Sequence, residues 1–269
     1  MAYALVTGAS SGLGTEFVWQ LARAGYNVVL VARDEQRLAQ LAQEVREQCA
    51  VEAEVLPADL SVLDDTQRVA QRIRDASREV RVLVNNAGFG LGQDFLGGAI
   101  ERECQALDVM VRAVLILSHA AAQSMVEFGG GIIINVSSMT ALTAQGTYSA
   151  HKAWVRTFSE GLAAELAGTD VSVTAVTPGL IRTEFHERSH VDAAQWPDWV
   201  FATAPQVVRA ALDAAWKGRV LVTPTLLYQV TAGVTRLAPR WLVRRLAGPG
   251  RSGRSISPSV AGIPPRNKE

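Results

Sequence analysis

Residues 3–14 read Tyr-Ala-Leu-Val-Thr-Gly-Ala-Ser-Ser-Gly-Leu-Gly, in which an apolar run is followed by glycines at positions 8, 12 and 14. The apolar run predicts a buried strand, and the pattern after position 14 predicts a helix. Glycine lets the backbone approach a ligand closely, and free N–H groups at a helix start attract anions. A turn with a purely structural role is the alternative. We expect a turn that binds a dinucleotide pyrophosphate, formed by Gly8, Ser10, Ser11, Gly12, Leu13 and Gly14.

The same alternation of short β-branched runs and longer helical patterns continues along the chain. It predicts strands at 3–7, 27–32, 52–56, 82–85, 131–137, 171–177 and 219–223, and helices at 14–24, 34–49, 63–78, 100–128, 147–168 and 205–216. Such alternation is typical of α/β proteins with a Rossmann-like, doubly wound parallel sheet and helices on both faces. We expect one domain over 1–225, a basic amphipathic helical extension over 226–247 and a disordered tail over 248–269.

The bulk composition excludes several classes of protein. Lys and Arg together number 26, as do Asp and Glu, so net charge gives no reason to expect a nucleic-acid partner. The charge is uneven, because residues 1–213 carry 25 acids and 16 bases whereas residues 214–269 carry one acid and ten bases. Cys49 and Cys104 form neither a disulfide framework nor a metal-ligand pattern. With no signal peptide and no long apolar span in the sequence, we expect a cytoplasmic protein without a metal.

A second motif, Tyr148-Ser-Ala-His-Lys152, carries the chemistry. Residues four apart share one face of a helix, so the Lys152 ammonium should lie beside the Tyr148 hydroxyl. A neighbouring cation favours the phenolate and lowers the pKa of a tyrosine from about 10 toward neutral pH. Such a phenol can donate or accept a proton while a hydride moves. The sequence therefore predicts a redox enzyme with a nicotinamide cofactor.

The residue after the second predicted strand distinguishes the two nicotinamide cofactors. An NAD site places an acid there to bind the ribose 2′-hydroxyl, whereas an Arg suits the 2′-phosphate of NADP. The strand ends on Ala32 and is followed by Arg33. Asp34 is the competing residue, and we expect it to cap the next helix. The sequence favours NADP(H) over NAD(H).

Four motifs in this order closely resemble the short-chain dehydrogenase/reductase family in its single-domain form: residues 7–14, Asn85-Asn-Ala-Gly88, Tyr148-Ser-Ala-His-Lys152 and Pro178-Gly179. The resemblance covers about residues 2–225. It implies an oxidoreductase that interconverts a carbonyl and a secondary alcohol on a small-molecule substrate, and a homodimer or homotetramer built on helices 100–128 and 147–168. Five residues of the sequence predict an apolar substrate pocket: Phe89, Leu91, Leu142, Trp196 and Trp199. A catalytically impaired, NADP(H)-binding regulatory protein is the alternative.

The resemblance also implies roles for individual residues. Tyr148 would be the acid/base, Lys152 would also bond the nicotinamide ribose, and Ser138 would polarise the substrate oxygen. The further cofactor contacts that it implies are Asp59 and Leu60 at the adenine, Asn86, Ala87 and Gly88 over the middle of the cofactor, and Gly179, Ile181 and Thr183 near the nicotinamide.

Two departures from the family pattern affect these roles. Ser138 precedes Tyr148 by 10 residues, where the family has about a dozen. Ser137 and then Thr140 are the alternatives to Ser138, and a hydroxyl at a strand end can also simply cap a turn. Met110 stands where the family usually has the Asn that holds a proton-carrying water chain. A thioether accepts hydrogen bonds only weakly, so we expect slower proton recharge or loss of activity.

Three further features lie outside these motifs. We expect residues 183–204 to form a lid in which Trp196 and Trp199 line a pocket or pack on the body, and His151 to face solvent or a partner. Pro239 should split the C-terminal extension into two helices. An apolar stripe there, flanked by arginines, suits packing on the domain or a sister subunit better than peripheral membrane contact. The stripe is Leu227, Val230, Val234, Leu237 and Trp241, and the arginines are Arg236, Arg240, Arg244 and Arg245.

Overall fold

The computed structural model describes residues 1–181 and 197–247, and its centre is one parallel sheet. The strand order β3-β2-β1-β4-β5-β6-β7 confirms the predicted doubly wound topology. All pairings between neighbouring strands are parallel. The strands are β1 Tyr3–Thr7, β2 Asn27–Ala32, β3 Ala53–Pro57, β4 Val80–Asn85, β5 Gly131–Val136, β6 Val171–Val176 and β7 Leu221–Val222.

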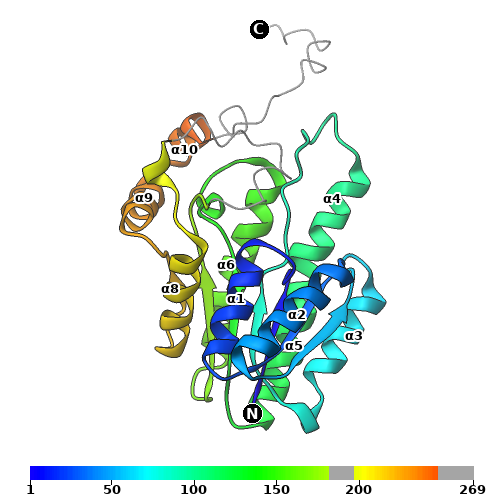
Figure 1. The fold of residues 1–269 in the computed structure, drawn as a ribbon. Helices are drawn as coiled ribbons and strands as arrows, with labels where there is room; N and C mark the ends of the chain where they lie inside the picture. The colour runs from blue at the N-terminus through cyan, green and yellow to red at the C-terminus, as the bar shows by residue number, and fades with distance from the viewer. Residues whose placement is uncertain (182–196, 248–269) are drawn as a thin grey trace, which may run out of the picture.

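Helices cover both faces of the sheet (Figure 1). One apolar layer joins the sheet to α1 Gly12–Arg23, α2 Glu35–Cys49 and α8 Ala204–Trp216. The other joins it to α3 Leu63–Ile73, α5 Ala113–Glu127 and α6 Gly146–Glu165. The inner strands are almost entirely buried because both of their faces are covered, which explains their nearly continuous Val, Ile and Leu.

One predicted helix is shorter than the sequence pattern indicated, and another is interrupted by a wider turn. The expected helix at 63–78 ends at Ile73 and is followed by a short 3-10 turn, Ala76–Arg78. The expected helix at 100–128 consists of α4 Ile100–Leu107, a π-helical turn Asp108–Arg112, and α5. The span Ile100–Glu127 is apolar and long enough to cross a membrane, but 56% of its apolar 18-residue stretch is buried inside the fold. It is a core helix of the sheet layer.

The motif residues gather at the carboxyl ends of the strands. In a parallel sheet all strands end on the same side, and the strand order reverses between β1 and β4. Ligands of doubly wound proteins bind at this switch point. The glycine loop follows β1, Asn86 follows β4 and Ser137 follows β5, so these segments meet there.

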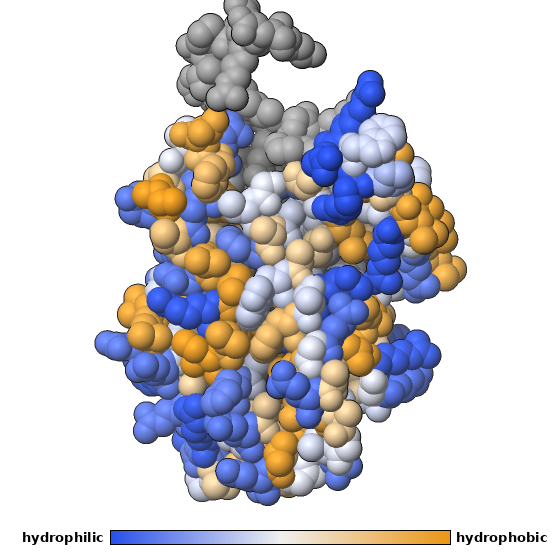
Figure 2. All heavy atoms as spheres, turned by 180° about the vertical axis from the view of Figure 1, so that it is seen from behind, coloured by the Kyte–Doolittle hydropathy of each residue, from blue (hydrophilic) through white to orange (hydrophobic). Residues whose placement is uncertain are grey.

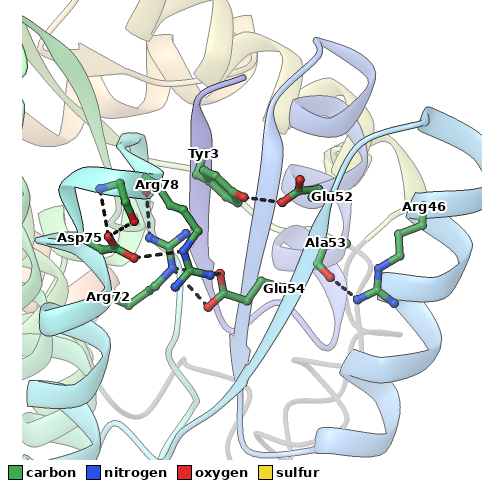
Figure 3. Close-up of polar contacts among 9 residues, drawn as sticks. Tyr3, Arg46, Glu52, Ala53, Glu54, Arg72, Asp75 and Arg78 are labelled. Carbon is green, nitrogen blue, oxygen red and sulfur yellow. Dashed lines mark hydrogen bonds and ion pairs between the residues drawn. The ribbon is translucent and has the colours of Figure 1, made fainter.

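A charged cluster lies at the amino ends of the strands, on the side opposite the motif residues (Figure 3). The Tyr3 hydroxyl donates to Glu52, and the Arg72 guanidinium lies 4.8 Å from the centre of the Tyr3 ring. Arg72 Nε and Arg78 Nη1 lie 2.9 and 3.1 Å from Glu54 Oε2. The cluster therefore joins β1, β3 and the end of α3, far from the motif residues.

After β7 the chain forms α9 Leu226–Leu237 and α10 Arg240–Leu246, and the split at Pro239 confirms that prediction. The predicted packing of the apolar stripe on the domain is wrong. Leu227, Val230, Val234, Leu237 and Trp241 are all exposed, while Ala232 and Val243 are buried. The small side chain of Ala232 lets α9 lie close to the body, so the larger apolar side chains point outward.

Candidate active site

The glycine loop has a backbone that other residues would not adopt. Gly8 and Gly12 have φ values of +66° and +57°. A Cβ on Gly14 would lie 2.0 Å from the Gly8 carbonyl oxygen. Ser11 stands at the N-cap of α1 without a side-chain cap bond, and the Ser10 and Ser11 hydroxyls have no partner among residues 1–181 and 197–247. The loop thus presents hydroxyls and helix-start N–H groups suited to a pyrophosphate.

Asn86 and Thr7 brace this loop against β4. The Asn86 amide Nδ2 donates to the carbonyl oxygens of Thr7 (2.9 Å) and Gly8 (3.3 Å). Thr7 Oγ1 accepts from the backbone N–H groups of Asn86 and Ala87 at 3.0 and 3.1 Å. A Cβ on Gly8 would meet Asn86 Nδ2 at 2.9 Å. The segment Asn86–Ala87–Gly88 therefore lies directly against the glycine loop, and the Asn86 side chain is used to hold it.

Arg33 and Asp34 have different surroundings after β2. The Asp34 carboxylate accepts from the Arg37 backbone N–H at 3.0 Å and caps α2, as predicted. Arg33 is exposed, and its guanidinium has no hydrogen-bond or ion-pair partner in the described part of the chain. The acid at this strand end is engaged with its own helix, whereas the cation is available to a ligand.

Asp59 and Leu60, predicted at the adenine, are differently placed. One Asp59 carboxylate oxygen accepts from the backbone N–H (2.9 Å) and the hydroxyl (2.7 Å) of Ser61. The Leu60 side chain is buried in the second apolar layer. Leu60 can therefore offer a ligand only its backbone.

Lys152 lies inside the protein on α6, one turn from Tyr148. Its ammonium donates to the Val136 carbonyl oxygen at 2.8 Å and lies 5.9 Å from the centre of the Tyr148 ring. Burial lowers the pKa of Lys152 from 10.5 to about 8. The side chain still carries its charge at neutral pH, and it carries that charge beside the phenol.

The hydroxyls at the end of β5 separate into structural and available groups. Ser137 is buried and its hydroxyl donates to the Lys152 carbonyl oxygen at 2.6 Å, so Ser137 holds β5 against α6. Ser138 Oγ accepts from the Thr140 backbone N–H at 3.2 Å and caps a short 3-10 turn, Met139–Leu142. An accepting hydroxyl keeps its own proton for another partner. Ser138 therefore does cap a turn, but it can still donate to a ligand.

Met110 lies within the π-helical turn and, like Lys152, borders Gly88. A Cβ on Gly88 would be 3.3 Å from Met110 Sδ and 3.4 Å from Lys152 Nζ. Met110 is completely buried. Met110 and Lys152 therefore both border Gly88, and a weakly accepting thioether occupies the position where the resemblance implies an amide. π-Helical turns are frequent at functional sites.

A buried polar ladder links the strands under the site, and the sequence analysis missed it. Asn85 Nδ2 donates to Asn135 Oδ1 (2.9 Å) and to Ser118 Oγ (3.0 Å). Asn135 Nδ2 donates to Ser159 Oγ at 2.9 Å. Asn85 and Asn135 are register partners on β4 and β5. The signal available in the sequence was an Asn at the end of each of two apolar strands.

Two predictions for the ring-bearing side chains are wrong. His151 is buried instead of facing solvent, and burial lowers its pKa against the opposing effect of Glu103 on α4. Trp199 is 72% exposed, so the prediction that it packs on the body is wrong. Trp196 lies outside the described residues, as does most of the expected lid.

Gly179 is required for a contact that the sequence did not reveal. A Cβ on Gly179 would lie 2.0 Å from the Tyr228 ring of α9. The Tyr228 hydroxyl accepts from the Leu180 backbone N–H and donates to the Val200 carbonyl oxygen, both at 3.0 Å. Ile181 is buried and bridges Ala202, and Thr183 lies outside the described residues. Tyr228 therefore positions the turn that follows β6.

Comparison with known proteins agrees with this architecture. The sequence model of the short chain dehydrogenase family matches residues 2–193. An uncharacterized oxidoreductase of Staphylococcus saprophyticus is 34% identical over 183 residues, which cover 67% of this chain and 78% of the relative. The chain belongs to the short-chain dehydrogenase/reductase family.

Solved structures place the fold in the same family. A short-chain dehydrogenase from Sphingobium yanoikuyae in complex with NADPH has a TM-score of 0.79 and 31% identity, covering 89% of this chain and 96% of that one. The bulky-bulky ketone specific alcohol dehydrogenase from Comamonas testosteroni has a TM-score of 0.75 and 29% identity over the same shares. The protein is an NAD(P)-dependent oxidoreductase of this family.

Proposed function

We propose that the protein is an NADP(H)-dependent oxidoreductase that interconverts a carbonyl and a secondary alcohol on an apolar substrate. The observation that carries the proposal is the Lys152 ammonium, which is buried, bonded to Val136 and adjacent to the Tyr148 ring. Burying a charged side chain costs free energy, so a buried ammonium beside a second ionisable group indicates a functional site. Here the neighbour is a phenol at the edge of the sheet where dinucleotides bind.

Three side chains of this chain divide the chemistry. The cofactor, when bound, supplies the hydride. In the reducing direction Ser138 donates a hydrogen bond to the substrate oxygen and holds it in place. Tyr148 donates its hydroxyl proton to that oxygen, and the Lys152 ammonium stabilises the phenolate that remains. Ser137 takes no part, because its proton is committed to the Lys152 carbonyl.

The glycine loop and Arg33 support the choice of cofactor. The cradle at Gly8 and Gly14, which a Cβ would fill, suits a pyrophosphate. Arg33 is a cation at the strand end with no ion-pair partner among the residues that the structure describes, and Asp34 is engaged at its helix. A 2′-phosphate would gain charge-assisted bonds there, whereas a bare 2′-hydroxyl would find no free carboxylate. The Sphingobium relative was solved with NADPH.

The finer assignments of substrate and assembly also belong to this proposal. Leu91 is buried in the core, so the apolar character of the substrate region rests on Phe89 and Leu142, which are partly accessible. Together with the Comamonas ketone enzyme this supports a bulky, apolar ketone or aldehyde as the substrate.

The exposed Leu115 and Val126 on α5 fit a homodimer or homotetramer. The free thiols of Cys49 and Cys104 fit the cytoplasm.

The test is turnover on a panel of apolar aldehydes and ketones with NADPH and with NADH. Wild-type protein should consume NADPH on at least one ketone. Tyr148→Phe should lower turnover by about 100- to 10,000-fold and leave NADPH binding, measured by fluorescence titration, unchanged. Ser138→Ala should lower turnover, while the matched Ser137→Ala should mainly lower stability. NADPH binding without turnover on any carbonyl would instead support the regulatory alternative.

A further inference from the structure

The outward side of α9 and α10 is apolar. We call it the outer face and define it as Leu226, Val230, Val234, Leu237 and Trp241, which are between 59% and 89% exposed. The residues turned inward are Tyr228, Ala232 and Val243. A helix that serves only to cover a domain buries its large apolar side chains. This pair of helices does the reverse, so the outer face is made for contact with something else.

Uncompensated positive charge surrounds the outer face. Arg236, Arg240, Arg244 and Arg245 are all exposed, and none forms an ion pair with a residue that the structure describes. Between residues 214 and 247 there are six basic residues and no acidic one. Seen from behind in Figure 2, hydrophobic spheres lie beside strongly hydrophilic ones along the edge formed by α9 and α10.

The apolar side chains and the positive charge together indicate what kind of partner binds the outer face. If two copies of the chain paired through the outer face, the four arginines of each copy would meet those of the other, and like charges would oppose the contact. An anionic lipid surface accepts both features, because apolar side chains enter the acyl boundary while arginines meet phosphate groups. Trp241 suits the headgroup region, because its indole ring has an apolar body and an N–H group that can bond to water or to headgroups. We propose that the outer face binds the surface of an anionic membrane.

The outer face lies beside the candidate active site. Tyr228 anchors α9 on the turn at Leu180, and Arg240 Nη1 donates to the Leu142 carbonyl oxygen at 3.1 Å, between Ser138 and Tyr148. In Figure 1 the tip of α4 stands at the same end of the molecule as α10. The loop at that tip exposes Phe95 and Leu96 by 65% and 77%. Docking would therefore bring the site close to the bilayer, where apolar substrates concentrate.

The experiment is co-sedimentation of the full chain with vesicles, and its result does not depend on enzymatic activity. Vesicles of phosphatidylcholine alone are compared with vesicles that also contain phosphatidylserine. Wild-type protein should bind the anionic vesicles, and high salt should weaken the binding. Arg244→Gln with Arg245→Gln should weaken it by about 25-fold, since each cation near such a surface contributes about fivefold.

A second pair of variants separates the outer face from general surface apolarity. Leu237→Gln with Trp241→Gln should weaken binding by at least about tenfold. Leu63→Gln on α3, which removes an exposed leucine elsewhere on the surface, should not change it. Circular dichroism and NADPH titration would verify that all variants are folded. Equal binding by the outer-face variant and wild type would overturn the proposal, as would loss of a dimer in that variant without vesicles, because a second copy would then be the partner.

Discussion

Replacing Lys152 by Met should make the protein inactive and, near neutral pH, more stable. The magnitude follows from burial, which lowers the pKa of Lys152 from 10.5 to about 8. That difference corresponds to about 3 kcal/mol of unfavourable free energy while the folded protein carries the charge. Methionine has a similar shape and carries no charge. It loses the hydrogen bond to the Val136 carbonyl, which costs about 1 kcal/mol. The variant should therefore gain about 2 kcal/mol near pH 7.

The sign of the pH dependence can be tested separately. Between pH about 8 and 10.5 the unfolded chain keeps the Lys152 proton and the folded chain has lost it, so wild-type stability rises with pH in this window. The Lys152→Met variant has no ionisable group at this position, so its stability does not gain from this proton loss. The extra stability of the variant should therefore shrink as the pH rises. Near pH 10.5 the wild-type protein should be more stable than the variant by about 1 kcal/mol, because it keeps the hydrogen bond to Val136.

Urea unfolding without cofactor, at pH values on both sides of about 8, measures both effects. Lys217→Met is the matched control, since Lys217 is exposed at the end of α8 and should show no such crossing. A Lys152→Met difference that stays constant across the pH range would refute the reasoning, because the cost would then not come from the buried charge.

Three other substitutions test single contacts. Arg33→Ala should weaken NADPH binding by about 10- to 100-fold and NADH binding much less, in parallel titrations; an equal loss for both would contradict a role in reading the 2′-phosphate. Met110→Asn should raise turnover several-fold and change NADPH binding little; unchanged turnover would show that the thioether does not limit proton supply. Tyr228→Phe should lower the free energy of unfolding by about 1–3 kcal/mol because two backbone groups lose their partner, whereas Tyr26→Phe should have little effect.

The sequence predicted the fold well because alternating local patterns specify a parallel sheet. It could not predict the π-helical turn at Asp108–Arg112, since the apolar pattern runs through it without interruption. It also predicted the periodicity of the α9–α10 stripe but not its direction. Periodicity defines a face, and only the packing of Ala232 and Tyr228 decides that this face points outward.

The candidate site was predictable where chemistry depends on local spacing, as for Tyr148 and Lys152. It was not predictable where a residue is committed to a distant partner. Ser137 and Ser138 are adjacent in the sequence, yet one bonds the backbone of α6 and the other caps a turn. Gly179 depends on Tyr228, 49 positions later, and no local signal connects them.

The π-helical turn has a consequence for how the chain can vary. A wide turn of this kind holds one residue more than an α-helix needs, and each residue rotates a helix by about 100°. Deleting one residue between Asp108 and Arg112 would restore a regular helix and keep its phase, because the wide turn holds the extra residue within about one turn, so Leu117 and Ala121 would still face the sheet. The same deletion within α5 would rotate the following residues by about 100°, so relatives of this protein should differ in length by one residue at Asp108–Arg112 rather than within α5.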